Sequence, residues 1–469
     1  MRALRILLPA VLVTACVPRP AQPPPPAADL FLDDLQRRTF EFFWETAEPV
    51  NGLVPDRWPS SPFSSIAAVG FGLTAYPVGV ERGWVSRQEA RDRSLATLQF
   101  FAGAPRGPEP AGVSGDRGFY YHFLDLDTGL RHGTNELSTI DTALLMAGVL
   151  FAQSYFDRDD PAEAEIRALA ETLYRRVEWP YFDRDDRGIT MAWRPEPDRG
   201  FGPGRWRGYD ESMILHVLAL GSPTHPLGPE VWERYTSTYR WGDFYGQEHL
   251  QFAPLFGHQY SHVWIDLRGI QDAFMGAKGV DYFESSRRAT LAQQAYAAAN
   301  PGGWRGYGAE VWGLTACDGP IDATLVIGGR ERRFHTYWAR GAALDDVRDD
   351  GTLAPTAAGG SIAFAPEVVI PALRAMRDRY GDHLYRRYGF VDAFNPTLDE
   401  PVATRAGAVV PGVGWFDDEY LGIDQGPIVL MIENHRSGLV WETMKKSPHV
   451  VRGLCRAGFR GGWLAGRCP

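Results

Sequence analysis

The chain has 469 residues, of which 44% are hydrophobic, so it is long enough for one large domain or for two or three ordinary ones. Its formal net charge of −10 and pI near 5.6 argue against nucleic-acid binding, because a phosphate-binding surface needs an excess of basic residues. Aromatic residues make up 13% of the chain and include 15 Trp and 19 Tyr. Flat apolar rings with polar edges suit carbohydrate binding.

The N-terminus has the features of a bacterial lipoprotein signal. A basic start is followed by a short apolar stretch, Ile6–Val13, and then by Val13-Thr-Ala-Cys16, which resembles a lipobox. We expect residues 1–15 to be the signal peptide, Cys16 to be lipidated, and the Pro-rich residues 16–29 to form a tether. The alternative is a plain cleaved signal followed by a chance cysteine. Export to the periplasm or outer membrane is the expectation, with Val17 favouring the outer membrane and with membrane contact only through Cys16.

From Leu30 onward the composition does not change, which predicts a single domain over residues 30–469. Apolar residues recur every three to four positions and predict helices. The predicted helices are Asp29–Glu48, Ser65–Tyr76, Ser86–Ala102, Ser138–Tyr155, Asp160–Val177, Asp210–Leu220, Gly228–Thr238, Trp264–Met275, Tyr282–Ala299, Ala365–Arg379, Asp424–Ser437 and Trp441–Ala457. Short β-prone stretches, Thr324–Gly328 and Gly188–Arg194, predict hairpins.

The predicted helices come in pairs, and the inner member of each pair is small and apolar, as in the stretches that begin at Ser65, Asp141 and Ser361. Small residues allow close packing in an inner layer. This pattern predicts an all-α fold, an (α/α)6 barrel in which a double ring of helical hairpins carries short β-hairpin decorations. A helical solenoid is the competing architecture, although no fixed sequence period is present.

Three cysteines remain after Cys16. In an oxidising compartment Cys455 and Cys468 are near enough to close a small loop and leave Cys317 free, but other pairings stay open. No CxxC motif or Cys/His cluster indicates zinc.

Carboxylates gather at the starts of several predicted helices. Glu136 and Asp141 precede or open one helix, Asp210 and Glu211 open another, and Asp424 opens a third. Each has a structural interpretation as a helix cap, since acids are favoured at helix N-termini. Glu211 is different, because it follows a competent cap.

Aromatic and apolar residues surround Glu211 in the sequence, including Trp206 and Tyr209. Loss of hydration in such surroundings raises the pKa of a carboxyl group and suits a general acid. Glycoside hydrolysis needs such an acid and a second carboxylate to activate water.

The sequence from about Leu30 to Phe459 resembles the glucoamylase-like domain of glycoside hydrolase family 144, the bacterial endo-β-1,2-glucanases. The segments that carry the resemblance are FEFFWETAEPVNGLVPDR, SIAAVGFGLTAYPVGVERGW, HGTNELSTIDTALLMAG, YDESMILHVLALGSPTHP, PLFGHQYSHVWIDLRGIQD, GYGAEVWGLTACDGP and GIDQGPIVLMIENHRSG. The resemblance implies an (α/α)6 barrel and metal-independent hydrolysis, with inversion, of linear β-1,2-glucan or its short fragments.

Carried over to this sequence, the resemblance implies that Glu211 is the general acid and Asp424 the base. Glu136 and Asp141 are implied to be cleft acids that bind or assist, and Asp141 is the alternative base. An inverting pair should lie roughly 6.5–9.5 Å apart, which leaves room for water.

Further residues are predicted to contact substrate, and neither a cofactor nor a metal is expected. His258, with His262 and Asp266, has metal-like spacing, but a sugar contact or a core histidine is the preferred interpretation. Arg57, Arg131 and Arg268 are candidates for binding hydroxyls or for structural ion pairs. The predicted substrate-binding residues are Tyr209, Trp206, Trp304, Tyr307, Glu310, Trp312, His258, Arg268 and Trp415.

Two other functions stay open. A polysaccharide lyase on a similar helical toroid would use Tyr, His or Arg as its base. A non-catalytic glycan-binding lipoprotein would need the aromatic residues but not the acids. For the hydrolase that the sequence favours, we expect a monomer whose partner is a glucan oligosaccharide or polysaccharide.

Overall fold

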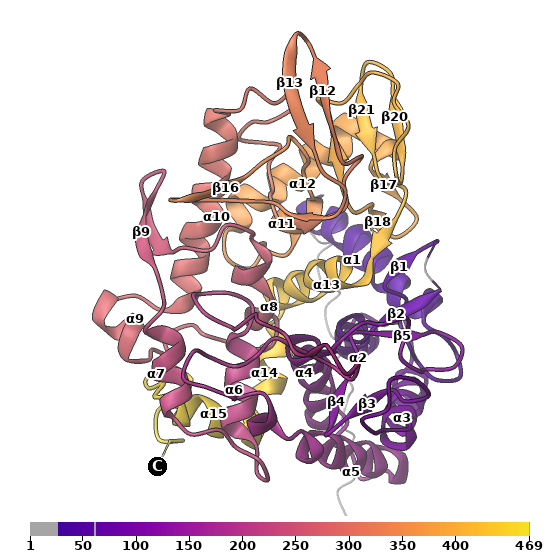
Figure 1. Ribbon diagram of the computed structural model, residues 1–469, viewed down its shortest axis with the longest axis vertical. Coiled ribbons are helices and arrows are strands. Elements are labelled where there is room, and N and C mark those ends of the chain that lie inside the picture. The colour runs from indigo at the N-terminus through magenta and orange to yellow at the C-terminus, as the bar shows by residue number, and fades with distance from the viewer. Residues whose placement is uncertain (1–26, 61, 469) are drawn as a thin grey trace, which may run out of the picture.

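The computed structural model describes residues 27–60 and 62–468, and this part of the chain is mostly helical (Figure 1). Its helices are α1 Ala27–Thr46, α2 Ile66–Glu81, α3 Arg87–Gly103, α4 Thr139–Tyr155, α5 Pro161–Arg176, α6 Met213–Gly221, α7 Glu230–Thr236, α8 Phe256–Trp264, α9 Ala273–Lys278, α10 Tyr282–Ala299, α11 Pro355–Gly359, α12 Pro366–Tyr380, α13 Gly422–Arg436, α14 Leu439–Met444 and α15 Pro448–Arg456. The predicted signal peptide and lipidated Cys16 lie outside the described residues. Helix α1 begins at Ala27, within the stretch assigned to the tether.

Short antiparallel strands connect the helices, as the hairpin predictions anticipated. They are β1 Arg57–Trp58, β2 Phe63–Ser65, β3 Gly115–Asp116, β4 Phe119–Tyr120, β5 Phe123–Asp125, β6 Leu137–Ser138, β7 Ala192–Arg194, β8 Gly200–Phe201, β9 Trp241–Phe244, β10 Gln247–Leu250, β11 Ala316–Cys317, β12 Ala323–Ile327, β13 Arg330–Phe334, β14 Trp338–Ala339, β15 Gly341–Ala343, β16 Asp346–Arg348, β17 Tyr385–Arg386, β18 Gly389–Phe390, β19 Phe394–Asn395, β20 Ala408–Val410, β21 Gly414–Phe416 and β22 Tyr420–Leu421. Strands β12, β13, β20 and β21 project from one end of the molecule in Figure 1.

Local sequence explains where the helices begin. Ser86 and Glu89 form a reciprocal capping box at α3, and Asp160 caps α5 with Pro161 in its first turn. Helices α2, α4, α6 and α13 are buried over most of their length, whereas α5 buries only one face. The helices that contain the stretches beginning at Ser65 and Asp141 are thus among the buried ones, as predicted.

Helices α2 and α4 approach each other closely, and this approach depends on glycine. A Cβ on Gly148 would lie 2.2 Å from the carbonyl oxygen of Gly70, and one on Gly70 would lie 2.3 Å from that of Leu144. Helix α2 also packs against α13, α4 against α6, and α8 against α6 and α13. One cluster of buried side chains extends from Phe31 to Leu464.

Two helix predictions were wrong. Residues 265–272 of the predicted helix over Trp264–Met275 form a loop between α8 and α9. In this loop Asp266 binds Arg268 and Lys445, and Asp272 caps α9. The predicted helix over Trp441–Ala457 is divided into α14 and α15. Ser447 caps the second helix and Pro448 occupies its first turn.

The C-terminus is covalently fixed by a disulfide. Cys455 and Cys468 are bonded across a sequence separation of 13, and Cys317 is free and buried, which confirms the proposed pairing. Among the described residues, no helix combines the length and apolar character needed to span a bilayer.

Candidate active site

Glu211 opens onto a cavity of about 170 Å³ formed where several helices begin. Asp141 comes from the first turn of α4, Tyr260 from α8 and Ile423 from α13, while His122 and Tyr337 come from loops. We call this the Glu211 cavity. It brings together Glu211 and Asp141, which are 70 positions apart in the sequence.

The adjacent acid, Asp210, has a structural role. Its Oδ1 accepts hydrogen bonds from the backbone N–H of Ser212 at 2.9 Å and from the hydroxyls of Ser212 at 2.5 Å and Tyr235 at 2.8 Å. Ser212, and not Asp210, is the N-cap residue of α6. Asp210 thus holds the turn that precedes the helix, and this turn directs Glu211 into the cavity.

The surroundings of Glu211 favour the protonated form of its carboxyl group. Burial raises the pKa of Glu211 well above its ordinary value, and the carboxylates of Asp210 and Asp141 raise it further. Its backbone carbonyl accepts a hydrogen bond from Ser261 Oγ at 2.9 Å, which fixes the turn from the α8 side. A protonated carboxyl beside a second acid is the arrangement that proton donation requires.

His122 links the two predicted cleft acids. Its Nδ1 lies 3.0 Å from Glu136 Oε1 and its Nε2 lies 3.6 Å from Asp141 Oδ1. Burial opposes protonation of the ring, but Asp141, Glu136 and Asp56 together raise the pKa of His122 to about 9. Despite its own burial, Glu136 has its pKa lowered to about 2 by His122 and Arg194.

The side chain of Ser138, the N-cap residue of α4, accepts a hydrogen bond from the Asp141 N–H and also contacts the Asp141 carboxylate. Asp141 is therefore held between the helix start and the imidazolium of His122.

Asp424 lies in a second group of acids rather than at a helix cap. The N-cap residue of α13 is Leu421, and Asp424 Oδ2 is buried without a hydrogen-bond partner among the described residues. Burial and the neighbouring Asp392 carboxyl raise the pKa of Asp424 well above its ordinary value. After burial, the Asp424 carboxylate is the main cause that raises the pKa values of Tyr260 and Tyr337, which line the Glu211 cavity.

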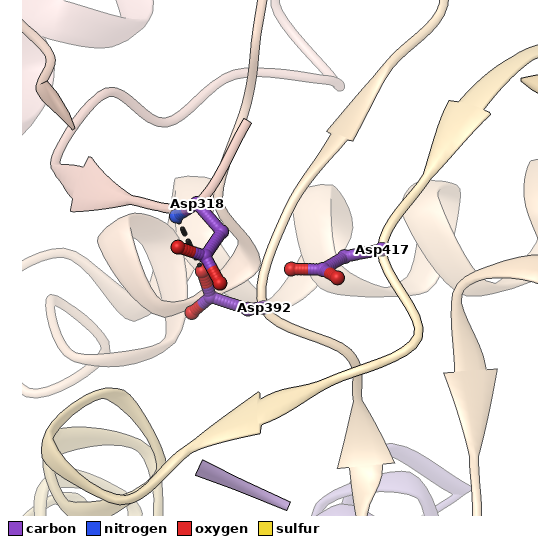
Figure 2. A group of neighbouring side chains, drawn as sticks. All are labelled: Asp318, Asp392 and Asp417. Carbon is purple, nitrogen blue, oxygen red and sulfur yellow. Dashed lines mark hydrogen bonds between the residues drawn. The ribbon is translucent and has the colours of Figure 1, made fainter. Parts of the chain in front are cut away.

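Asp318, Asp392 and Asp417 complete this acid cluster, converging from three separate loops (Figure 2). The Asp318 N–H donates to Asp392 Oδ2 at 2.8 Å, and burial together with Asp318 raises the pKa of Asp392 to about 7. One oxygen from each of the three residues lies within 4.8 Å of the others, a spacing that a hard divalent cation could bridge.

Arg57 already neutralises part of the cluster. Its guanidinium contacts Asp318 at 2.6 Å, Asp56 at 3.1 Å and Glu419 at 3.2 Å. Asp56 and Arg57, with His122, Tyr337 and Ile423, line a further cavity of about 160 Å³, which we call the Arg57 cavity. Since His122, Tyr337 and Ile423 line both cavities, the two are adjacent.

Most of the predicted aromatic contacts lie elsewhere. His258, Trp312 and Trp415 are fully buried, and Trp206 is a core residue whose Nε1 donates to Thr139 at 2.9 Å. Burial lowers the pKa of His258 well below its ordinary value, as expected for a core histidine. None of these four side chains lines the two cavities in the described part of the chain.

The remaining predicted residues also lie outside the two cavities. Tyr209 borders a separate cavity of about 370 Å³. Trp304 packs under Arg332, and Tyr307 donates to Asp349 at 2.7 Å, with the exposed Glu310 in the same loop. Arg268 pairs with Asp266 beyond the C-terminal end of α8, away from Phe256 and Tyr260, which line the Glu211 cavity from its first turns.

Several residues of the site were not predicted from the sequence, above all His122, Tyr337, Asp318 and Asp392. Arg57 was considered only as a general hydroxyl-binding or ion-pairing candidate. Asp318 lies in one of the segments that carry the family resemblance, which was an available signal. His122 and Tyr337 lie outside those segments and had no such signal.

Comparisons with known proteins identify relatives of this chain. The chain is 29% identical over 463 residues to an exo β-1,2-glucooligosaccharide sophorohydrolase (non-reducing end) of Parabacteroides distasonis, covering 92% of this chain but only 58% of the relative's length. The crystal structure of an endo-β-1,2-glucanase from Chitinophaga pinensis, in complex with sophorotriose and glucose, has 26% identity and a TM-score of 0.77, covering 94% of this chain and 100% of that one.

A family model described as "Putative glucoamylase" matches residues 203–448. A crystal structure of a Bacteroides uniformis protein with the same description has 30% identity and a TM-score of 0.78, and the match covers 94% of this chain and 100% of that one. The chain therefore belongs to this glucoamylase-like (Glycoamylase) family.

Proposed function

We propose that this protein is a glycoside hydrolase that cleaves β-1,2-linked glucan or its oligosaccharides by an inverting two-carboxylate mechanism. The observation that carries the proposal is Glu211, whose carboxyl has a raised pKa and opens onto a cavity shared with Asp141. The names of the Parabacteroides and Chitinophaga relatives support β-1,2-glucan as the substrate class.

In the proposed reaction, Glu211 gives its proton to the glycosidic oxygen as the bond from that oxygen to C1 breaks. A carboxylate base takes a proton from a water molecule, whose oxygen then bonds to C1 from the opposite face. Asp424 is the proposed base and Asp141 the alternative. To act as the base, Asp424 must be deprotonated, although burial and the neighbouring Asp392 favour its protonated form. Asp141, in contrast, lies beside the cationic His122.

A direct test is product analysis on linear β-1,2-glucan with three proteins: wild type, Glu211→Gln and the exposed control Glu331→Gln. We expect wild type and the control to release saturated short β-1,2-glucooligosaccharides, and Glu211→Gln to release none. Intact glucan with wild type would contradict the substrate. Product absorbing in the ultraviolet would indicate the lyase alternative, and tight glycan binding without cleavage would indicate the non-catalytic one.

We further propose that the helices close into an (α/α)6 barrel and that the protein is an exported lipoprotein anchored at Cys16. The barrel is supported by the successive packing of α2, α4, α6, α8 and α13. Export is supported by the Cys455–Cys468 disulfide, because disulfides persist in oxidising compartments. Labelling with radioactive palmitate should mark the wild-type protein and not Cys16→Ser, and equal labelling would contradict the anchor.

A further inference from the structure

Tyr337 stands where the Glu211 cavity and the Arg57 cavity meet. It lines both, and its side chain is 51% exposed although it belongs to a large aromatic residue. Burial of its hydroxyl and the carboxylates of Asp424, Asp392 and Asp56 raise the pKa of its phenol. The exposed surface of Tyr337 contributes to the walls of both cavities.

Hydrogen bonds on both sides of Tyr337 in the sequence fix its backbone. The buried Arg340 donates from Nη2 to the carbonyls of His335 at 3.0 Å and Thr336 at 3.2 Å, and Asp350 fixes its guanidinium at 2.7 Å. Cys317 of β11 pairs with Trp338, immediately after Tyr337. An exposed aromatic ring on a fixed backbone loses little conformational entropy when a ligand binds.

Titratable side chains line the same two cavities as this ring. His122 lines the same junction, Asp141 and Glu211 lie on one side, and Asp56 and Arg57 lie on the other. A flat apolar face with donors and acceptors around it is complementary to a pyranose ring, whose C–H face stacks and whose hydroxyls form hydrogen bonds. The several acids around the site do not match the few hydrogen-bonding edges of a planar nucleobase. An anionic ligand would be repelled by the same acids.

From this geometry we propose that the junction of the two cavities is a sugar-binding position, in which Tyr337 stacks against a glucosyl unit next to the bond that Glu211 protonates. The substrate chain then continues past Tyr337 toward Arg57 and Glu419. This inference rests on the proposed function, because it places the substrate of that reaction.

The test is calorimetric binding of sophorotriose to the Glu211→Gln protein, alone and with a second substitution. Tyr337→Ala should lower affinity about tenfold, which is the effect of losing one aromatic stacking contact. Tyr337→Phe keeps the ring and should stay within about threefold of the parent. Tyr245→Ala is the matched control, since Tyr245 is 40% exposed and borders neither cavity.

The outcomes separate this inference from the function on which it rests. If sophorotriose binds the parent and Tyr337→Ala binds it equally well, the stacking position is wrong and the hydrolase proposal stands. If the parent does not bind sophorotriose and wild type does not cleave β-1,2-glucan, the proposed function fails and the stacking position fails with it. Tyr337→Phe losing as much affinity as Tyr337→Ala would also overturn the stacking role.

Discussion

Replacing His122 by Gln should remove a pH-dependent part of the stability of the cleft. The ring is hydrogen-bonded to Glu136 at 3.0 Å, lies 3.6 Å from Asp141, and has a side chain only 28% exposed. Raising its pKa from 6.5 to about 9 corresponds to about 3 kcal/mol in favour of the charged ring. Because the pKa is raised on folding, this stabilisation is complete below about pH 6.5 and is lost as the pH rises through about 9.

The assay is urea unfolding of wild type and His122→Gln at a series of pH values. The difference between their free energies of unfolding should shrink by about 3 kcal/mol between about pH 6 and pH 10. His383→Gln, at an exposed histidine, is the control and should show a small, constant difference. If the difference for His122→Gln is the same at every pH, the imidazolium does not hold the two cleft acids and the reasoning is refuted.

Three other changes have defined outcomes. Asp141→Asn removes a negative charge beside Glu211, so the pKa of Glu211 should fall. The alkaline limb of the pH profile of kcat/KM should then move to lower pH. An unmoved limb would show that Asp141 does not raise the pKa of Glu211. Gly148→Ala should destabilise the protein by about 1–3 kcal/mol in urea unfolding because its Cβ has no room against Gly70, whereas Gly276→Ala in α9 meets nothing within 4 Å and should be neutral or slightly stabilising. Replacing Cys455 and Cys468 by Ser should lower the free energy of unfolding by about 2–4 kcal/mol, and adding reductant should lower that of the wild-type protein by the same amount. If neither experiment lowers it, the disulfide does not stabilise the protein.

Helix positions followed from local sequence where caps and periodicity agreed. Tyr282–Ala299 was predicted with both ends correct, because Asp281 caps the helix and Asn300 ends it in the left-handed region. The stretch after Trp264 failed because its apolar period continues while Asp266 is held by Lys445, a residue far away in the sequence. The residues next to Asp266 in the sequence do not indicate such a contact.

The site divides in the same way. Glu211 could be predicted because its hydration depends partly on neighbours in the sequence, and Asp141 because it lies in the first turn of a recognisable helix. The link that His122 makes to Glu136 and Asp141, and the meeting of Asp318, Asp392 and Asp417, depend on how separate loops fold together. The predicted aromatic residues do not line these two cavities, because Trp and Tyr also fill the core, as Trp312 and Trp415 do.

The central claim is inverting hydrolysis of a β-1,2-linkage with Glu211 as the acid. Proton NMR of the first products formed from linear β-1,2-glucan tests it most directly. We predict that new reducing ends appear first as the α-anomer with wild type, and that none appear with Glu211→Gln. Initial release of the β-anomer would mean retention and would contradict the water-activating base, while undiminished product from Glu211→Gln would contradict the assignment of the acid.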